Sequence, residues 1–412
     1  MISKIRIKGL YDIYNYDIDF SKNGKVLILT GPNGYGKTTI LQIINHFCQG
    51  KFWLFYYLNF QLIELSFDDG VSFAITKNGV QLVGAQYKSA IIDMYDAQGK
   101  RVELGNIDET YIETLLQNIR EYESSILPEK IDILLEQYCL PRMKEKANLR
   151  LPKIYEYTLL LDCVMIEEQR LISNKLLRTI IPVRTVEDIQ TNIHKFFVDA
   201  QRTYNSASLK IDGTFVKRLS DSKPVQNAKS ISKEKIYNQV VKKIAEYQKF
   251  GLVGELNVVS NLGVHYHAVL KLYLKDLYDK LESIDGYYRK LALFDKIVSG
   301  KHLSNKKLKF EKDEMVIVDK NGNEIPIHKL SSGEQNLLVL CYKLVFEMND
   351  NHILLVDEPE NSMHIAWLKH LLDDYILVSE ETGCQIIIAT HSPSFISGRW
   401  DLTYDLCENG AC

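Results

Sequence analysis

The chain has 412 residues, of which 46% are hydrophobic, and its formal net charge at pH 7 is −3. This length suffices for two domains, or for one domain that carries a large insertion. The small net charge excludes a global positive field that would attract nucleic acid or an anionic membrane, so any DNA contact must come from a local patch.

The cysteines and the apolar segments indicate where the protein resides. The seven cysteines are scattered and form no Cys-x-x-Cys pair, which argues against a zinc ribbon and a secreted disulfide framework and favours the cytoplasm. Residues 1–7 alternate polar and apolar side chains, like a strand and unlike a signal peptide. The most apolar window, residues 52–60, is about half the ~20 residues that span a bilayer. We therefore expect no membrane segment.

The N-terminal part of the chain is predicted to be strands around one helix. Residues 1 to about 30 have strand-like patterns, and a helix is predicted from Thr38 to about Phe47. Two further strands are predicted at residues 62–67 and 71–76, followed by a hairpin turn at Asn78-Gly79. This pattern is typical of an antiparallel sheet beside a parallel nucleotide-binding core.

The middle of the chain is predicted to be mainly helical. Helical spacing extends from about residue 109 to 138, and an apolar run then predicts a core strand at residues 159–169. Residues 216–235 are polar and basic, which is typical of a loop.

A heptad seam then predicts an antiparallel helical hairpin over about residues 231–298. If its second helix is continuous over residues 264–298, it spans on the order of 50 Å. A lid packed on the core and a projecting arm are equally compatible with this pattern. The seam residues are Leu270, Leu274, Leu277, Leu281 and Ile284.

The C-terminal part begins with strands at residues 308–310 and 315–318, which an Asn321-Gly322 turn joins to Ile325. We predict three regions: residues 1–80 and 301–412 as the two halves of one domain, and residues 81–300 as a helical insertion or lid.

The strongest motif is the stretch GPNGYGKTT at residues 31–39, between an apolar run and a helix. It fits the pattern G-x-x-x-x-G-K-[ST], in which backbone N–H groups and a helix N-terminus hold nucleotide phosphates. Lys37 is predicted to reach the β- and γ-phosphates, and the Thr38 hydroxyl to bind Mg²⁺. A glycine-rich turn without a ligand is the structural alternative. The other predicted binding residues are Asn33, Gly34, Gly36 and Thr39.

Two later strands are predicted to end in polar side chains. Residues 353–356 are apolar and lead into carboxylates, as in a buried parallel strand with an acidic tip. Asp357 is predicted to hold Mg²⁺ with Thr38, and Glu358 to deprotonate the water that attacks the γ-phosphate. His391 follows a second core strand and is predicted to hydrogen-bond to the γ-phosphate or to that water. A solvated acidic turn and a structural histidine are the alternatives.

The stretch Leu330 to Gln335 (LSSGEQ) precedes another predicted helix. Ser331 and Gly333 at a helix N-terminus are predicted to form a second anion site. Such a site has a function if it completes the nucleotide pocket of another subunit. A plain N-cap, with Ser331 and Glu334 as a capping box, explains the same residues. Both interpretations remain open from the sequence.

In their order along the chain, namely residues 31–38, 330–335, 353–358 and His391, the four motifs resemble the Walker A, signature, Walker B and switch-histidine motifs of the ABC-type ATPase heads of the SMC/RecF/OLD group. The resemblance covers roughly residues 1–80 and 300–400. It implies an α/β head, with a mixed or parallel sheet that carries the phosphate loop, an antiparallel β-subdomain and a helical insertion. It also implies ATP and Mg²⁺ as ligands, and Lys37, Glu358 and His391 as catalytic residues.

The same resemblance implies that two heads enclose two ATP molecules in a homodimer or a higher homo-oligomer. Ser331 and Gly333 would then contact the γ-phosphate that is bound by the opposite subunit. Gln169 resembles the Q-loop glutamine, which touches both Mg²⁺ and the attacking water. Residues 360–364 lie where the family has its D-loop and look more like the bacterial defence ATPases than the transporters.

Spacing narrows the choice within the group. The long separation of Lys37 from the signature at residues 330–335 is unlike a transporter cassette. The helical insertion is too short for SMC arms, and too few residues follow His391 for the nuclease domain of OLD proteins. The chain thus resembles a stand-alone ATPase subunit of anti-phage systems such as Septu or PARIS, which restrains a separate effector, a nuclease or toxin encoded nearby.

A RecF-like clamp on DNA is the alternative function, with a basic loop that contacts phosphates. A solvated linker explains the same loop structurally. Its basic residues are Lys217, Arg218, Lys223, Lys229, Lys233 and Lys235.

Overall fold

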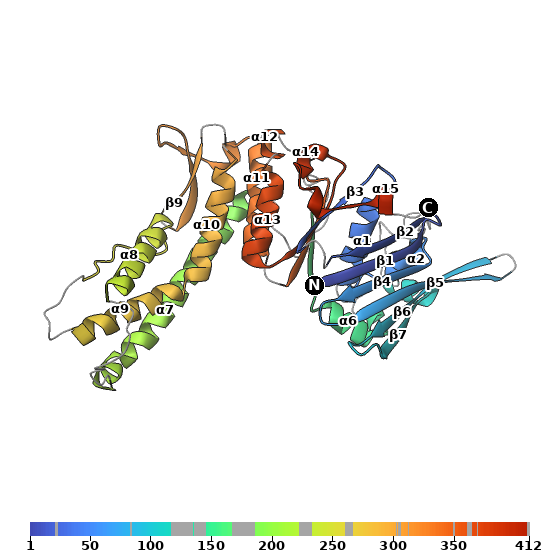
Figure 1. Cartoon of the computed structure of the whole chain (residues 1–412), viewed down its shortest axis with the longest axis horizontal. Helices are drawn as coiled ribbons and strands as arrows, with labels where there is room; N and C mark the ends of the chain where they lie inside the picture. Colours follow the sequence, from blue (N-terminus) through green and yellow to red (C-terminus); the bar gives the residue numbers. More distant parts are fainter. Residues whose placement is uncertain are drawn as a thin grey trace. The chain divides into compact units, whose positions relative to one another are not determined.

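The computed structural model describes most of the chain. The residues outside the description are 21–23, 83–84, 117–134, 136–145, 167–185, 222–232, 260–266, 302, 304–305, 312, 349–350, 361–364, 369 and 410–412. The chain divides into two compact units (Figure 1). The first unit comprises Met1–Thr179 with Met348–Cys412, and the second unit comprises Ile180–Glu347.

These units do not coincide with the three predicted regions. Residues 301–347 belong to the second unit, together with most of the predicted insertion, whereas residues 348–412 join the N-terminal part of the chain. The assignment of residues 1–80 and 301–412 to one functional head stays a prediction.

The first unit contains an antiparallel sheet of six strands in the order β2-β1-β4-β5-β6-β7. In β4 buried and half-exposed residues alternate, as in a sheet with one face against the core. The sheet confirms the antiparallel part of the predicted fold. Its strands are β1 (Ile2–Leu10), β2 (Tyr14–Asp19), β4 (Leu62–Phe67), β5 (Ser72–Leu82), β6 (Ala85–Tyr95) and β7 (Arg101–Ile107).

The predicted hairpin turn at Asn78-Gly79 is wrong. Both residues lie within β5, where Asn78 pairs with Ser89 and Gly79 with Lys88, and the β5–β6 ladder continues as far as Leu82. Main-chain pairing with β6 overrides the local turn preference of this dipeptide.

The first unit also contains a sheet of five strands in the order β14-β3-β13-β12-β8. All of its strand pairs are parallel, and every residue of β3, β12 and β13 is buried. These three strands, which precede the phosphate loop, the acidic tip and His391, are therefore neighbours. The strands are β3 (Val26–Thr30), β8 (Asp162–Ile166), β12 (His352–Asp357), β13 (Gln385–Ala389) and β14 (Thr403–Asp405).

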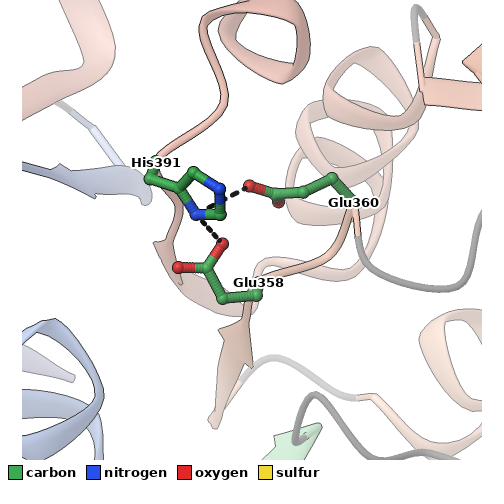
Figure 2. Close-up of side chains that lie close together, drawn as sticks. All are labelled: Glu358, Glu360 and His391. Atoms are coloured by element: carbon green, nitrogen blue, oxygen red, sulfur yellow. Dashed lines mark hydrogen bonds and ion pairs between the residues drawn. The ribbon is translucent and has the colours of Figure 1, made fainter. Parts of the chain in front are cut away.

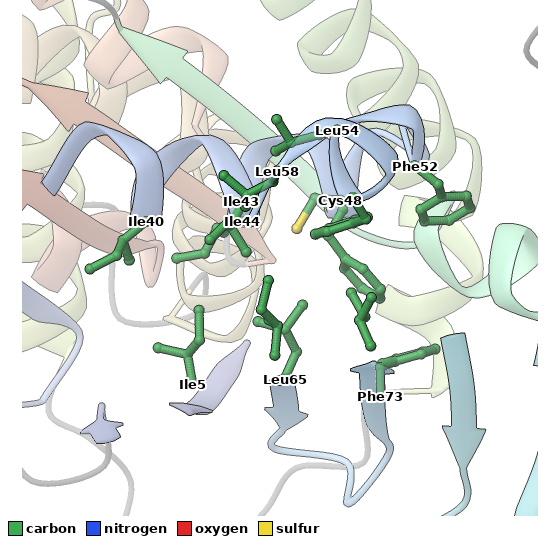
Figure 3. Packing of buried hydrophobic residues seen from close by; sticks show 14 of the residues in the cluster. Ile5, Ile40, Ile43, Ile44, Cys48, Phe52, Leu54, Leu58, Leu65 and Phe73 are labelled. Atoms are coloured by element: carbon green, nitrogen blue, oxygen red, sulfur yellow. The ribbon is translucent and has the colours of Figure 1, made fainter. Parts of the chain in front are cut away.

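Helix α1 (Lys37–Cys48) belongs to one apolar core with both sheets. Its buried isoleucines lie close to Ile5 and Leu65 of the antiparallel sheet (Figure 3), and Leu355 of the parallel sheet belongs to the same cluster. Burial of each such side chain stabilises the fold by about 1.5–3 kcal/mol. This packing holds the N-terminus of α1, and so the phosphate loop, next to the ends of the parallel strands.

Further helices lie in the described part of the first unit. They are α2 (Trp53–Tyr57), α3 (Glu109–Leu116), α6 (Pro152–Thr158), α12 (Ile365–Leu368), α13 (Leu371–Thr382), α14 (Pro393–Ile396), η5 (Trp400–Leu402) and α15 (Leu406–Asn409). Helix α3 confirms the start of the helical segment predicted from residue 109, and most of its remainder lies outside the described residues.

The core strand predicted at residues 159–169 begins later than expected. Leu159 and Leu160 are 66% and 75% exposed and form a turn after α6, and only β8 (Asp162–Ile166) is strand. An apolar run does not reveal by periodicity where a short strand starts. Residues 167–169, and with them Gln169, lie outside the described residues.

The second unit consists of helices and a small antiparallel sheet in the order β11-β10-β9. The sheet confirms the predicted strands and the Asn321-Gly322 turn, where Gly322 has a φ of 85°. The elements are α7 (Val186–Asp221), α8 (Lys233–Lys249), α9 (His267–Glu282), α10 (Asp285–Ser299), β9 (Lys307–Glu311), β10 (Glu314–Val318), β11 (Glu324–Ile325), η3 (Ile327–Lys329), α11 (Ser332–Tyr342) and the π-helical η4 (Lys343–Glu347).

The heptad seam is buried as predicted, with at most 7% exposure at any of its five residues. However, the continuous helix over residues 264–298 is wrong, because α9 ends at Glu282 and α10 begins at Asp285. Lys243 and Tyr247 of α8 each donate a hydrogen bond of 2.6 Å to the Asp285 carboxylate. This anchored carboxylate in the first turn of α10 favours a new helix start at that position.

The loop predicted at residues 216–235 is wrong at both of its ends. Residues 216–221 continue α7, residues 233–235 begin α8, and only the residues between lie outside the description. Arg218 donates hydrogen bonds to both carboxylate oxygens of Asp276, which is 4% exposed. This pairing compensates the buried charge of Asp276 and holds Arg218 of α7 against α9, a contact that composition alone did not predict.

Candidate nucleotide-binding site

The phosphate loop joins β3 to α1 and has the backbone of an anion-binding turn. Gly34 and Gly36 have φ values of 91° and 81°, in the left-handed region that favours glycine. A Cβ atom at Gly34 would meet no atom within 4 Å, so the requirement for glycine there is conformational. Helix α1 begins at Lys37, directly after the loop.

A cavity of ≈ 460 Å³ opens beside this loop. It brings together residues from the N-terminal and C-terminal parts of the sequence, as predicted, because β3, β13 and β12 are neighbours in one sheet and ligands bind at the carboxyl ends of such strands. The lining residues are Tyr11, Asn33, Gly34, Gly36, Lys37, Thr38, Thr39, Glu358 and His391.

Thr38 contacts the carboxylate expected of it, whereas the Lys37 ammonium contacts carbonyls of its own loop. The Lys37 ammonium donates hydrogen bonds to the carbonyls of Gly31 and Pro32 at 2.8 and 3.2 Å. The Thr38 hydroxyl donates to Asp357 Oδ1 at 3.2 Å. A hydroxyl and a carboxylate are the hard oxygen donors that Mg²⁺ prefers beside nucleotide phosphates, so these two residues fit the predicted ion.

Glu358 follows β12 with a strained backbone and a perturbed carboxyl. Its φ is 43°, and its N–H donates to the carbonyl of Ala389 at 2.9 Å. Burial and the nearby carboxyl of Glu360 raise its pKa to about 7, against the opposing effect of His391. A non-glycine residue in this region is uncommon and is often found at functional sites.

His391 contacts Glu358 directly. Its Nδ1 atom lies 2.6 Å from Glu358 Oε2 (Figure 2). The histidine side chain is 52% exposed and that of Glu358 is 12% exposed. The predicted general base Glu358 and the predicted phosphate or water contact His391 therefore form a pair, in which the imidazole contacts the carboxylate.

Glu360, the first residue of the predicted D-loop, belongs to this site, although the sequence gave its side chain no role. Residues 361–364 of that loop lie outside the described residues. The Thr390 hydroxyl donates a hydrogen bond to Glu360 Oε1, which also lies 3.8 Å from His391 Nδ1. Ligand atoms of Glu358, Glu360 and His391 lie within 4.8 Å of one another, a spacing at which they could share a metal ion. The one feature of the sequence that indicates Glu360 is its position two residues after Glu358.

Tyr11 is a second residue that was missed. It lies in the turn between β1 and β2, with a φ of 55°, and its hydroxyl is 2.9 Å from that of Thr39. Its side chain is 42% exposed and lines the cavity. The tyrosine-rich composition of this turn was its only signal in the sequence.

The signature residues lie in the second unit, at the start of α11. Ser331 is the N-cap: its hydroxyl accepts from the N–H of Glu334 at 3.4 Å, and its own N–H donates to Glu334 Oε2 at 2.9 Å. The capping-box interpretation is therefore confirmed. Gly333 lies in the first turn of α11. A contact of Ser331 and Gly333 with a nucleotide of another subunit stays a prediction, as does the role of Gln169.

Comparisons with known proteins bear on the fold and the family. No curated protein matches the chain. Similar solved structures include an Smc head bound to the C-winged helix domain of ScpA, with 12% identity over 96% of this chain and 91% of that chain and a TM-score of 0.34. The SMC head domain from Thermotoga maritima has 12% identity over 96% and 90%, with a TM-score of 0.33.

A third similar structure is an Smc head domain with an extended coiled coil, bound to the C-terminal domain of ScpA, derived from Pyrococcus furiosus. Its identity is 14% over 96% of this chain and 91% of that chain, and its TM-score is 0.35. The α/β fold assignment rests on the two sheets of the first unit and not on these likenesses.

The glycine turn after β3, the buried lysine at the start of α1 and the carboxylates at the end of β12 have the arrangement expected of a P-loop ATPase. The model of the AAA ATPase domain family matches residues 1–396, and the chain belongs to this family. The prediction of an ATPase domain is thereby confirmed.

Proposed function

We propose that this protein binds and hydrolyses ATP with Mg²⁺, forms a homodimer or higher homo-oligomer around the nucleotide, and controls a separate effector in bacterial anti-phage defence. The observation that supports ATP turnover best is the pairing of Glu358 with His391 at 2.6 Å, beside the Thr38–Asp357 hydrogen bond of 3.2 Å. Family membership supports the ATPase part.

Each residue of the site has a separate role in the proposed reaction. Lys37 would exchange its loop carbonyls for the β- and γ-phosphates. Thr38, together with Asp357 to which it is hydrogen-bonded, would hold Mg²⁺, and the bound ion would neutralise phosphate charge. Glu358 accepts a proton from the attacking water. His391 holds the Glu358 carboxylate in place and stabilises its ionised form through the 2.6 Å contact.

Glu360→Gln tests how much the Glu360 carboxyl contributes to positioning Glu358 and His391. Loss of the Glu360 carboxylate weakens its bond to Thr390 and so loosens the backbone that carries His391. We expect ATP hydrolysis to slow by about tenfold, equivalent to about 1.4 kcal/mol, with ATP affinity unchanged. Single-turnover hydrolysis and equilibrium binding measure both quantities. Wild-type turnover would show that Glu360 does not position the site.

The dimer proposal rests on the resemblance of residues 330–335 to a signature that acts across an interface. Ser331→Arg tests it, because the bulky cation would obstruct the contact with the partner's γ-phosphate. We expect hydrolysis to fall by about 100-fold or more, the cost of losing a key transition-state donor, while isolated subunits still bind ATP. Steady-state hydrolysis and ATP titration are the measurements.

Asn321→Arg is the matched control for Ser331→Arg, because Asn321 is exposed in the turn between β10 and β11 of the same unit. It adds the same side chain without touching the signature and should leave hydrolysis unchanged. Full activity of the Ser331 variant would mean that the signature does not act between subunits.

The link to an effector rests on family resemblance, which covers the ATPase and says little about its partners. Co-purification of this chain with the product of a neighbouring gene, in the absence of DNA, is the expected result. Phage-challenge assays then measure the defence role. They compare cells that carry this gene and its neighbour with cells in which this gene encodes Lys37→Ala. Purification of the chain alone, with no protection from phage, would contradict the proposal.

A DNA clamp is the second candidate function. The structure weakens one argument for it, the predicted basic loop. Arg218, a basic residue assigned to the DNA-contacting loop, is bonded to Asp276. Lys223 and Lys229 lie outside the described residues. A salt-dependent shift of the purified protein on DNA would favour the clamp.

Within the described residues, no helix is long and apolar enough to cross a membrane.

A further inference from the structure

The signature helix α11 begins beside a buried ion pair that the sequence analysis did not predict. Glu334 is 2% exposed, and both of its carboxylate oxygens accept hydrogen bonds from the Lys306 ammonium, at 2.7 and 2.8 Å. Lys306 lies directly before β9 and far from the signature in the sequence. Its side chain is 21% exposed, so the pair is largely shielded from water.

The same carboxylate holds the signature serine. Glu334 Oε2 accepts hydrogen bonds from both the hydroxyl and the N–H of Ser331, each at 2.9 Å. A serine hydroxyl has one proton to donate. In this conformation Ser331 therefore donates it to Glu334, and the two residues and Lys306 form one connected chain of hydrogen bonds.

The carboxylate is ionised in this chain. Burial alone would raise the pKa of Glu334, but the Lys306 ammonium and the bonds from Ser331 hold it below its usual value. The negative charge of Glu334 thus lies next to the Ser331 hydroxyl. In the proposed function, this hydroxyl contacts the γ-phosphate of the nucleotide that is bound by the partner subunit. Without a cation beside it, that charge would repel the phosphate.

We propose that Lys306 is a positioning residue of the signature, which neutralises the buried Glu334 carboxylate so that Ser331 can approach the γ-phosphate of another subunit. This inference rests on the proposed function, because it needs a nucleotide that is shared between subunits. It adds a residue outside all four motifs to the interface. Lys306 touches no nucleotide in this scheme and acts through Glu334 alone.

The experiment compares ATP-dependent dimerisation of full-length variants. All carry Glu358→Gln to prevent hydrolysis, and mass photometry measures the dimer fraction as ATP is raised. For Lys306→Met we expect the ATP concentration at half-maximal dimerisation to rise by about tenfold, with ATP binding to monomers unchanged. Lys306→Arg keeps the charge and should dimerise like the parent.

A double variant separates charge compensation from loss of folding. Glu334→Gln retains a capping box, because glutamine is accepted at that position, and removes the charge that Lys306 neutralises. Lys306→Met combined with Glu334→Gln leaves no uncompensated buried charge and should dimerise at the parent's ATP concentration. Lys307→Met, at an exposed neighbour on β9, is the matched control and should have no effect.

The outcomes distinguish this inference from the proposed function. If the parent protein does not dimerise with ATP, both fail. If the parent dimerises and Lys306→Met dimerises equally well, Lys306 is not a positioning residue and only the inference is overturned. It is also overturned if the double variant stays as impaired as Lys306→Met, whether through misfolding or weak assembly, because charge compensation predicts recovery.

Discussion

Glu358→Gln is expected to slow ATP hydrolysis by about 10²–10⁴-fold, the contribution of a positioned general base, and to trap an ATP-bound dimer. Glutamine has nearly the same shape as glutamate, so the packing of Glu358 against His391 should survive. What is lost is the ability to accept a proton from the attacking water. The ATP-bound state then accumulates because the step that ends it is blocked.

Single-turnover hydrolysis and the mass of the assembly with ATP measure the two parts of this prediction. Glu380→Gln, at an exposed position of α13 in the same unit, is the matched control and should behave like the wild type. Hydrolysis by the Glu358 variant at the normal rate would exclude this carboxylate as the base. Slow hydrolysis without a trapped dimer would contradict assembly around ATP.

Lys37→Ala is expected to abolish nucleotide binding. Lys37 is 5% exposed and lies in the loop with its ammonium against the carbonyls of Gly31 and Pro32. The variant loses the cation that would face the phosphates, and each charged hydrogen bond there contributes about 1.5–3 kcal/mol. Two such bonds correspond to at least about a 100-fold loss of affinity.

Isothermal titration with ATP and Mg²⁺ measures this loss directly. Lys100→Ala is the control, because Lys100 is an exposed lysine near the start of β7 in the same unit. It should bind ATP as the wild type does. Retained ATP binding by the Lys37 variant, with a normal melting temperature, would show that this lysine does not contact the nucleotide.

The residues around the phosphate loop were predictable because their signals are local. The glycines of residues 31–36, the apolar run before Asp357 and the strand before His391 each indicate a strand end that carries polar groups. In α/β sheets, such ends face ligands. The structure places these three strands side by side in one sheet.

The middle of the chain was predicted less well, because its structure depends on distant partners. The polar ends of the predicted loop at 216–235 are helical, where Arg218 pairs with Asp276. The seam helix is interrupted at Asp285, which Lys243 and Tyr247 of another helix anchor. Neither partner is detectable from local composition.

By itself, the sequence determined the class of site: a phosphate loop, an acidic strand tip and a histidine, each identified by residues adjacent in the chain. Only the tertiary structure decided which side chains surround them. Glu360 reaches His391 because strands β12 and β13 run parallel, and Lys306 reaches Glu334 because the chain folds back onto α11. Hydrogen bonds and ion pairs act over a few ångströms whatever the separation in sequence, so folding alone brings such partners together.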